Sequence, residues 1–263
     1  MKKYALLAGS NFVGTQNELN GCLNDLDNMR SLLEAYDVEI VADLRGSDMT
    51  TSNWKNAMMD IAKKAESGDT IFHSHSHHGA KTRSLDGMGF DEIWCPDDFD
   101  WKDAHMIRDD WMAALMDMLK PGVKWIDFCD CCHAGGSLRD LWYQNERPRY
   151  IENPELTNKL FGFNSKPTVT PLVVSGENYK GILLAACRSN QTSADAFIDG
   201  QYCGAFTYHF LKALRENMEG NYEELMIRTT DLLGLGGYDQ KPELDCKTGD
   251  EHNKFKTDVL DTL

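Results

Sequence analysis

Short apolar runs alternate along this chain with segments of helical periodicity, and this alternation limits the fold more than any other feature. Residues 4–8, 38–44, 69–74, 125–129 and 181–187 have the length and apolar content of buried strands. In residues 19–33, 54–65, 111–118, 205–216 and 222–233, apolar side chains recur at the spacing of helices that bury one face. Strands alternating with helices predict an α/β fold, with a mostly parallel sheet covered by helices on both faces.

The length of 263 residues is enough for one domain with a substantial core. Residues 137–180 interrupt the alternation, because they have no clear period and carry Pro148, Pro154, Pro167 and Pro171 among polar residues. A long irregular segment inside a compact domain is usually functional. We therefore expect a linker at 137–180 between a larger part, residues 1–136, and a smaller part, residues 181–263.

Charge and cysteine content narrow the class of function. The net charge of −15 repels phosphate backbones, so we expect neither nucleic acid nor an anionic membrane as the main partner. The apolar run that follows Met1 is too short for a signal peptide or a membrane span, which predicts a cytoplasmic protein. In that compartment the 8 cysteines are expected to be reduced thiols.

Residues suited to nucleophilic catalysis follow several of the expected strands. In open α/β sheets, ligands bind beyond the carboxyl ends of the strands, where residues 9–25, 76–79, 130–136 and 187–195 would meet. These segments hold the pair His78-Gly79 and a cluster of two cysteines and a histidine at 131–133. A thiolate needs an imidazole to accept and return its proton, and backbone N–H groups to hold the oxyanion. The pattern predicts a cysteine hydrolase.

Six segments in chain order resemble motifs of the caspase-like peptidases, and specifically of the metacaspases. The opening strand and first helix are represented by residues 4–12 and 14–25. Ser76-His-His-Gly79 resembles a Ser-Gly-His-Gly motif, and Asp130-Cys-Cys-His-Ala-Gly135 resembles Asp-Ser-Cys-His-Ser-Gly. Residues 186–195, 204–207 and 240–244 resemble motifs of the small subunit. The resemblance implies a three-layer caspase-like sandwich around a mostly parallel six-stranded sheet.

The resemblance also implies an activity. It predicts a monomeric endopeptidase that cleaves after Arg or Lys through a thioester, with Cys132 as nucleophile and His78 as its acid/base partner. Cys131, the rival nucleophile, falls where the family has Ser. The backbone N–H groups of Gly79 and Cys132 would form the oxyanion hole. The pocket for the basic side chain maps onto Cys22, Asp25, Ser76 and Asp130, and two carboxylates there suit a guanidinium.

Calcium stimulation and self-processing are further implications of the resemblance. The acidic calcium ligands of the family map onto Asp98, Asp109, Asp110 and Asp140, and carboxylate oxygens are what Ca²⁺ prefers. Candidate self-cleavage points in the linker are Arg139, Arg147, Arg149, Lys159 and Lys166. The chain departs from the family motifs at three positions: His77 replaces Gly, Ala134 replaces Ser, and Gly136 is inserted.

Two other classes of function remain open at this point. The run His73-Ser-His75-Ser-His77-His78 resembles the ligand run of zinc-dependent metallo-hydrolases, since imidazoles at alternating positions can converge on zinc. However, the Asp of that run is replaced by His77. A catalytically idle scaffold of caspase-like fold is the second alternative, and the presence of both His78 and Cys132 counts against it.

Overall fold

The computed structural model describes residues 1–85, 87, 89–132, 147–156, 181–188, 191–247 and 249–261. Its centre is a six-stranded sheet in the order β13-β10-β7-β3-β1-β2. The strands are β1 (Lys3–Gly9), β2 (Glu39–Arg45), β3 (Thr70–Ser76), β7 (Lys124–Asp130), β10 (Ile182–Ala185) and β13 (Glu243–Asp245). All neighbours are parallel except β13, which runs antiparallel to β10. This confirms the predicted mostly parallel six-stranded sheet.

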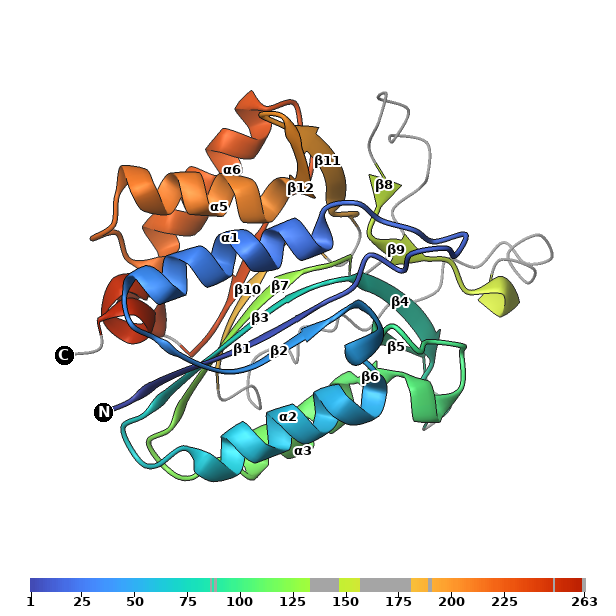
Figure 1. Ribbon diagram of the computed structural model, residues 1–263, viewed down its shortest axis with the longest axis horizontal. Coiled ribbons are helices and arrows are strands. Elements are labelled where there is room, and N and C mark those ends of the chain that lie inside the picture. The colour runs from blue at the N-terminus through green and yellow to red at the C-terminus, as the bar shows by residue number, and fades with distance from the viewer. Residues whose placement is uncertain are drawn as a thin grey trace.

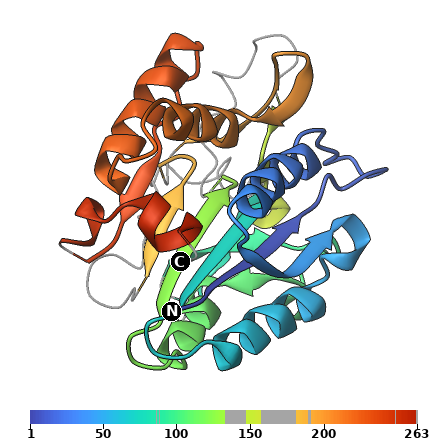
Figure 2. The ribbon, with the colours of Figure 1, turned by 60° about the vertical axis from the view of Figure 1, so that its left-hand side comes forward.

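Helices cover both faces of this sheet (Figures 1 and 2). One face carries α1 (Cys22–Ala35), α5 (Ala205–Glu216) and α6 (Tyr222–Leu235), and the other carries α2 (Thr51–Lys64) and α3 (Asp109–Asp117). Successive side chains of a strand point to opposite faces, so Leu7 of β1 packs in the core under α1 and α5, whereas Leu6 packs with Trp54 of α2. The three layers follow from two apolar faces on each central strand.

Two small sheets lie at the carboxyl edge of the central sheet. One has the order β6-β5-β4-β9, formed by β4 (His78–Arg83), β5 (Phe90–Cys95), β6 (Ile107–Arg108) and β9 (Tyr150–Ile151). The other has the order β12-β11-β8, formed by β8 (Arg147–Pro148), β11 (Ala194–Ile198) and β12 (Gln201–Gly204). Because β8 and β9 come from the expected linker, residues 147–151 connect the two small sheets (Figure 1).

Helix caps explain where two of the helices begin. The Thr50 hydroxyl accepts a hydrogen bond from the backbone N–H of Asn53 at the start of α2, and Asn221 and Glu224 form a capping box at the start of α6.

Among the described residues, no helix is both long and apolar enough to cross a membrane. All eight cysteines lie among the described residues, and none of them forms a disulfide bond.

Candidate active site

The predicted nucleophile and base follow two adjacent strands. β3 and β7 pair in parallel with Ser76 opposite Asp130, and His78 and Cys132 each lie two residues beyond this pair. The backbone N–H groups of Gly79 and Cys132 donate to the same acceptor, the carbonyl oxygen of Arg149, over 3.0 and 3.2 Å. The two N–H groups predicted to form an oxyanion hole therefore converge on one carbonyl oxygen.

Glycine is required at position 79. A Cβ atom there would lie 1.7 Å from the carbonyl oxygen of Cys132, which is far inside van der Waals contact. Only a residue without a side chain lets the two backbones approach this closely. The Gly in the predicted His-Gly pair thus has a direct steric role in the site.

The imidazole of His78 is arranged as a proton acceptor. Its Nε2 lies 2.7 Å from the backbone carbonyl of Asn17, and since a carbonyl only accepts, Nε2 carries the proton. Nδ1 is buried and has no hydrogen-bond partner among the described residues, so it presents a lone pair. Burial lowers the pKa of His78 to about 4, although the hydrogen bond to the Asn17 carbonyl acts in the opposite direction, and the charge of Arg149 lowers the pKa further. The ring is neutral at physiological pH and can take a proton on Nδ1.

The two neighbouring cysteines have different surroundings. Cys132 Sγ accepts a hydrogen bond of 2.8 Å from the backbone N–H of Ser193, in the segment that leads into β11. Cys131 Sγ instead lies 3.1 Å from Cys129 Sγ in the core beneath α2 and α3. Burial raises the pKa of Cys131 well above its usual range, which keeps the thiol protonated and unreactive. The environment favours Cys132 as nucleophile.

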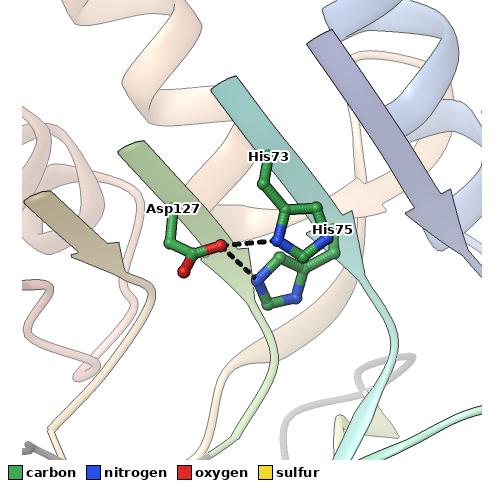
Figure 3. A group of neighbouring side chains, drawn as sticks. All are labelled: His73, His75 and Asp127. Atoms are coloured by element: carbon green, nitrogen blue, oxygen red, sulfur yellow. Dashed lines mark hydrogen bonds and ion pairs between the residues drawn. The ribbon is translucent and has the colours of Figure 1, made fainter. Parts of the chain in front are cut away.

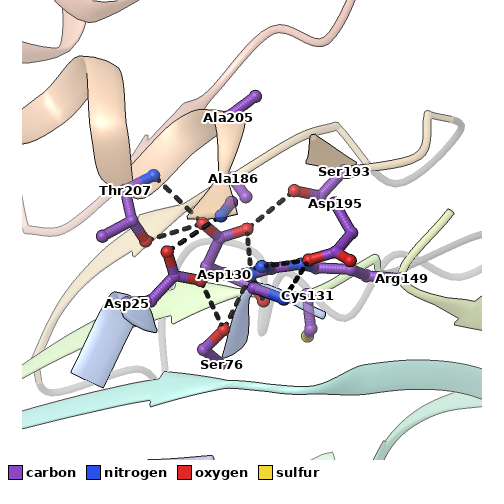
Figure 4. Close-up of polar contacts among 12 residues, drawn as sticks. Asp25, Ser76, Asp130, Cys131, Arg149, Ala186, Ser193, Asp195, Ala205 and Thr207 are labelled. Carbon is purple, nitrogen blue, oxygen red and sulfur yellow. Dashed lines mark hydrogen bonds and ion pairs between the residues drawn. The ribbon is translucent and has the colours of Figure 1, made fainter. Parts of the chain in front are cut away.

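The predicted pocket residues surround one guanidinium, that of Arg149 (Figure 4). Arg149 Nη2 lies 2.8 Å from Asp25 Oδ2, and Nη1 lies 3.1 Å from Asp130 Oδ1 and 2.7 Å from Ser76 Oγ. The Arg149 side chain is fully buried. Cys22, also fully buried, is the first residue of α1, three residues before Asp25. The structure therefore brings the predicted pocket together around a basic side chain of the chain itself.

Sequence reasoning missed a third carboxylate in this pocket. Asp195 Oδ1 lies 3.0 Å from Arg149 Nη2, and both carboxylate oxygens of Asp195 also accept backbone N–H groups, from Asn20 and Gly21. The sequence places Asp195 within residues 187–195, which are expected at this edge of the sheet, and within a small-subunit motif, but gives it no role in the pocket. Asp195 lies on β11, outside the central sheet, and nothing in the sequence indicates that this strand reaches the pocket.

The pocket walls are held by the small part of the chain. Asp130 accepts hydrogen bonds from the Ser193 hydroxyl and from both the N–H and the hydroxyl of Thr207. Gly204 donates its N–H to Asp25, and a Cβ at Gly204 would lie 2.1 Å from Asp130 Oδ2. Ser193, Thr207 and Gly204 are further site residues that the sequence did not assign, although residues 204–207 had been recognised as a motif.

Burial of so many carboxylates has an electrostatic cost. Burial raises the pKa of Asp25 to about 7, while the charge of Arg149 acts in the opposite direction. Three carboxylates face a single guanidinium, so the charges that line the pocket attract a cation. A basic side chain is the occupant that this charge pattern suits.

The segment that carries Arg149 crosses the site in an extended conformation. Pro148 pairs with Ala194 of β11 and Tyr150 pairs with Gly79 of β4, while the Arg149 N–H donates to the carbonyl of Ser193 over 3.1 Å. A cavity of about 450 Å³ lies beside it, lined by His78, residues 15–19 and residues of the same segment. Main-chain pairing on both sides of one residue is how extended peptides bind in clefts.

The predicted calcium ligands are only partly grouped. Asp109 and Asp110, at the start of α3, lie with Asp91 of β5, so that carboxylate oxygens of all three are within 4.8 Å of one another. Asp98 lies elsewhere, where its carboxylate accepts the N–H and hydroxyl of Thr51 at the start of α2. Among the described residues, the acidic group that contains Asp109 and Asp110 includes Asp91 and does not include Asp98, which satisfies free groups at a helix end. Asp140 lies outside the described residues.

The four histidines of the alternative zinc run do not converge on one point. His73, His75 and His77 lie on the face of β3 toward α2, where His73 and His75 contact Asp127 (Figure 3). His78 instead bonds to Asn17. The first three imidazoles are fully buried, whereas a hydrolytic zinc site keeps a position open to water and substrate.

A sheet of this topology, with a histidine and a cysteine at adjacent strand ends and an acidic pocket beside them, defines a caspase-like cysteine peptidase. The family model described as "Caspase domain" matches residues 2–252, and the chain belongs to that family.

Named relatives narrow the class. The chain is 30% identical to Metacaspase-1 of Botryotinia fuckeliana, over 93% of this chain and 68% of the relative. It is 31% identical to Metacaspase-1 of Pyricularia oryzae, over 93% of this chain and 72% of the relative. A crystal structure of a Geobacter sulfurreducens protein superposes with a TM-score of 0.72 over 99% of both chains at 22% identity, which supports the fold. The chain is thus a metacaspase-like cysteine peptidase.

Proposed function

We propose that this peptidase cleaves after arginine and lysine, and that its own Arg149–Tyr150 bond is its first substrate. One observation carries the proposal: Arg149 fills the acidic pocket with its side chain while its carbonyl oxygen accepts the N–H groups of Gly79 and Cys132. A peptide bond about to be cleaved would present the same two groups to the same two subsites. Of the five self-cleavage points predicted in the linker, this favours Arg149.

The proposed reaction uses the residues in the following order. The Cys132 thiol gives its proton to Nδ1 of His78, and the sulfur attacks the carbonyl carbon of Arg149. The resulting oxyanion is held by the two backbone N–H groups, which typically contribute a hundredfold or more in rate each. The bond to the Tyr150 nitrogen breaks as His78 returns its proton to that nitrogen. Water, deprotonated by His78, then attacks the thioester; the C–S bond breaks, the Arg149 carboxylate is released, and His78 returns its proton to the Cys132 sulfur.

Mass spectrometry of the purified chain tests self-cleavage. The parent chain should yield one fragment that ends at Arg149 and another that begins at Tyr150, and the Cys132→Ala chain should remain intact. Arg149→Gln should abolish this cut. Arg147→Gln is the matched control, because Arg147 donates to the backbone carbonyl of Glu18 and not to the pocket. An intact parent chain, or a cut elsewhere that Arg149→Gln does not affect, would overturn this part of the proposal.

A panel of fluorogenic peptides ending in Arg, Lys or Asp tests the specificity. Three carboxylates in the pocket favour Arg, whose planar guanidinium can bind two of them at once, over Lys, and exclude Asp by charge repulsion. Turnover of the Asp peptide in preference to both basic peptides would refute the pocket assignment.

We further propose that Ca²⁺ stimulates the activity through Asp91, Asp109 and Asp110, with Asp140 as a fourth ligand. The donor set fits, because hard cations prefer carboxylate oxygens. Burial, together with the charge of Asp91, raises the pKa of Asp109 to about 6, so a cation there would relieve repulsion between like charges. Asp110→Ala should raise the calcium concentration needed for half-maximal turnover, and Asp98→Asn, the control, should not. A parent enzyme indifferent to calcium would refute the role of this cluster.

A further inference from the structure

Three imidazoles form a row on the buried face of β3 and of the residue that follows it. His73, His75 and His77 alternate along the chain, are each fully buried, and pack edge-on against Trp54 of α2. Their surroundings are otherwise a core of tryptophan, methionine and aliphatic side chains. Polar groups in such a core are costly unless they are hydrogen-bonded. The row therefore needs an explanation that core packing alone does not give.

The direction of each hydrogen bond can be deduced from the two ends of the row. Burial lowers the pKa of both His73, to about 4, and His77, so each ring is neutral and carries one proton. At one end, the indole N–H of Trp54 can only donate, and it lies 2.9 Å from His73 Nε2. His73 therefore carries its proton on Nδ1 and donates it to Asp127 Oδ1 over 2.6 Å.

This tautomer argues against a metal at the group formed by His73, His75 and Asp127. A metal ligand must offer a lone pair, and the lone pair of His73 is already used by Trp54. His73 Nδ1 and Asp127 Oδ1 are also 2.6 Å apart, the distance of a hydrogen bond rather than of two ligands around one ion. Hydrogen bonding, rather than metal coordination, best explains the contacts drawn in Figure 3.

At the other end, the row reaches the proposed active site. His77 Nδ1 lies 2.7 Å from the backbone carbonyl of His78, which can only accept, so Nδ1 of His77 carries the proton. His77 Nε2 then accepts from Nδ1 of His75 over 2.8 Å. Nε2 of His75 lies 3.5 Å from Asp127 Oδ1 and makes no hydrogen bond to the described residues. A hydrogen-bonded chain therefore runs from His75 through His77 to the backbone carbonyl of His78.

The carbonyl that accepts from His77 belongs to a functionally important peptide group. The C=O of His78 and the N–H of Gly79 are the two ends of one planar peptide unit. That N–H donates to the Arg149 carbonyl oxygen, in the proposed oxyanion hole. A hydrogen bond to the C=O end fixes the plane of the unit and polarises its N–H, which strengthens the bond made at the other end.

We propose that His77 is a positioning residue that orients and polarises the His78–Gly79 peptide so that the Gly79 N–H points at the developing oxyanion, with His75 holding the His77 ring. The proposal rests on the proposed function only in naming the Gly79 N–H as an oxyanion donor. It gives a role to one of the departures from the family motif, since His77 stands where the family has Gly. A glycine there could not donate to the His78 carbonyl.

Kinetics with a fluorogenic peptide ending in Arg test the proposal. His77→Leu removes the donor and should lower kcat about tenfold to a hundredfold, the effect typical of losing a residue that supports a catalytic group, with KM changed less than twofold. His77→Asn places an amide N–H near the former Nδ1 and should restore most of kcat. His73→Leu is the matched control, because it removes the same side chain from the same buried face without touching the His78 carbonyl; it should lower the melting temperature and leave kcat unchanged.

A second measurement does not depend on peptidase activity. In the uncleaved Cys132→Ala chain, the amide resonance of Gly79 should shift with His77→Leu and return toward its original position with His77→Asn, while His73→Leu should leave it in place. An unmoved Gly79 amide, or a kcat that falls equally with His73→Leu and His77→Leu, would overturn the positioning role. Absence of turnover in the parent would instead refute the proposed function, and the amide resonances would still decide the role of His77.

Discussion

The Arg149 guanidinium should contribute a large share of the stability of the uncleaved chain. It makes ion pairs of 2.8, 3.1 and 3.0 Å with Asp25, Asp130 and Asp195, and all four side chains are almost completely buried. Removing one partner from a buried ion pair typically costs about 3–5 kcal/mol, because the remaining charge is left uncompensated. Replacing Arg149 with Gln in the Cys132→Ala chain should therefore lower the free energy of unfolding by about 3 kcal/mol or more.

Thermal and urea unfolding measure this effect. A loss of about 3 kcal/mol corresponds to a melting temperature lower by roughly 10 °C for a domain of this size. Arg147→Gln is again the control, and it should change the melting temperature little, because among the described residues the Arg147 side chain bonds only to the exposed backbone carbonyl of Glu18.

The destabilised variant should also be rescued by a ligand. A short peptide ending in Arg can occupy the vacated pocket, so millimolar peptide should raise the melting temperature of Arg149→Gln by mass action. It should have little effect on the uncleaved parent sequence, whose pocket already holds Arg149. Equal melting temperatures for the Arg149→Gln and Arg147→Gln chains would refute the reasoning, as would a variant that the peptide does not stabilise.

Three further predictions concern single side chains. Gly204→Ala should raise KM for Arg peptides at least tenfold, because the new methyl group would collide with Asp130, whereas Gly234→Ala, which meets nothing within 4 Å, should not. The folded-state pKa of Asp25 is raised from 3.8 to about 7, so its contribution to stability is greatest below about pH 4 and falls as the pH rises toward 7. In urea unfolding of the uncleaved chain, this carboxyl should lower the free energy of unfolding by up to ~4 kcal/mol between pH 4 and 8, and Asp25→Asn should remove that decrease. Cys131→Ser should keep kcat within a few-fold while lowering stability, and loss of activity there with retention in Cys132→Ser would reassign the nucleophile.

The central layers could be predicted from sequence because their signals are local. Residues 4–8, 69–74 and 125–129 became β1, β3 and β7, since a strand buried on both faces is an apolar run whatever lies next to it. The short strands at the carboxyl edge were missed. β4, for example, reads His-Gly-Ala-Lys-Thr-Arg, which has no apolar periodicity, and it is a strand because it pairs with β5 and β9. Such tertiary pairing leaves little trace in composition.

The residues of the candidate site also divide into those that could be predicted from the sequence and those that could not. His78 and Cys132 could be placed because each directly follows a predicted strand, and parallel neighbours end at one edge. Asp195 lies in residues 187–195, which the sequence placed at this edge, but its role in the pocket could not be predicted, because it depends on the antiparallel pairing of β11 with β12 and β8, and its partner Arg149 is 46 residues away. The same limit applies to Asp98, whose neighbours in sequence gave no sign that it binds the start of α2.

Arg149 shows what decides between equivalent residues in an irregular segment. Composition does not distinguish it from Arg147, which lies two residues earlier in the same segment. The difference arises because the chain leaves one small sheet after Pro148 and enters the other at Tyr150, so Arg149 is the residue at the crossing. Its N–H donates to the Ser193 carbonyl, and its carbonyl oxygen accepts from the Gly79 N–H. Its side chain extends into the acidic pocket. If self-cleavage occurs, the bond that is cut is therefore selected by strand pairing on both sides of it, and an Arg moved by one position along this segment should not be cleaved.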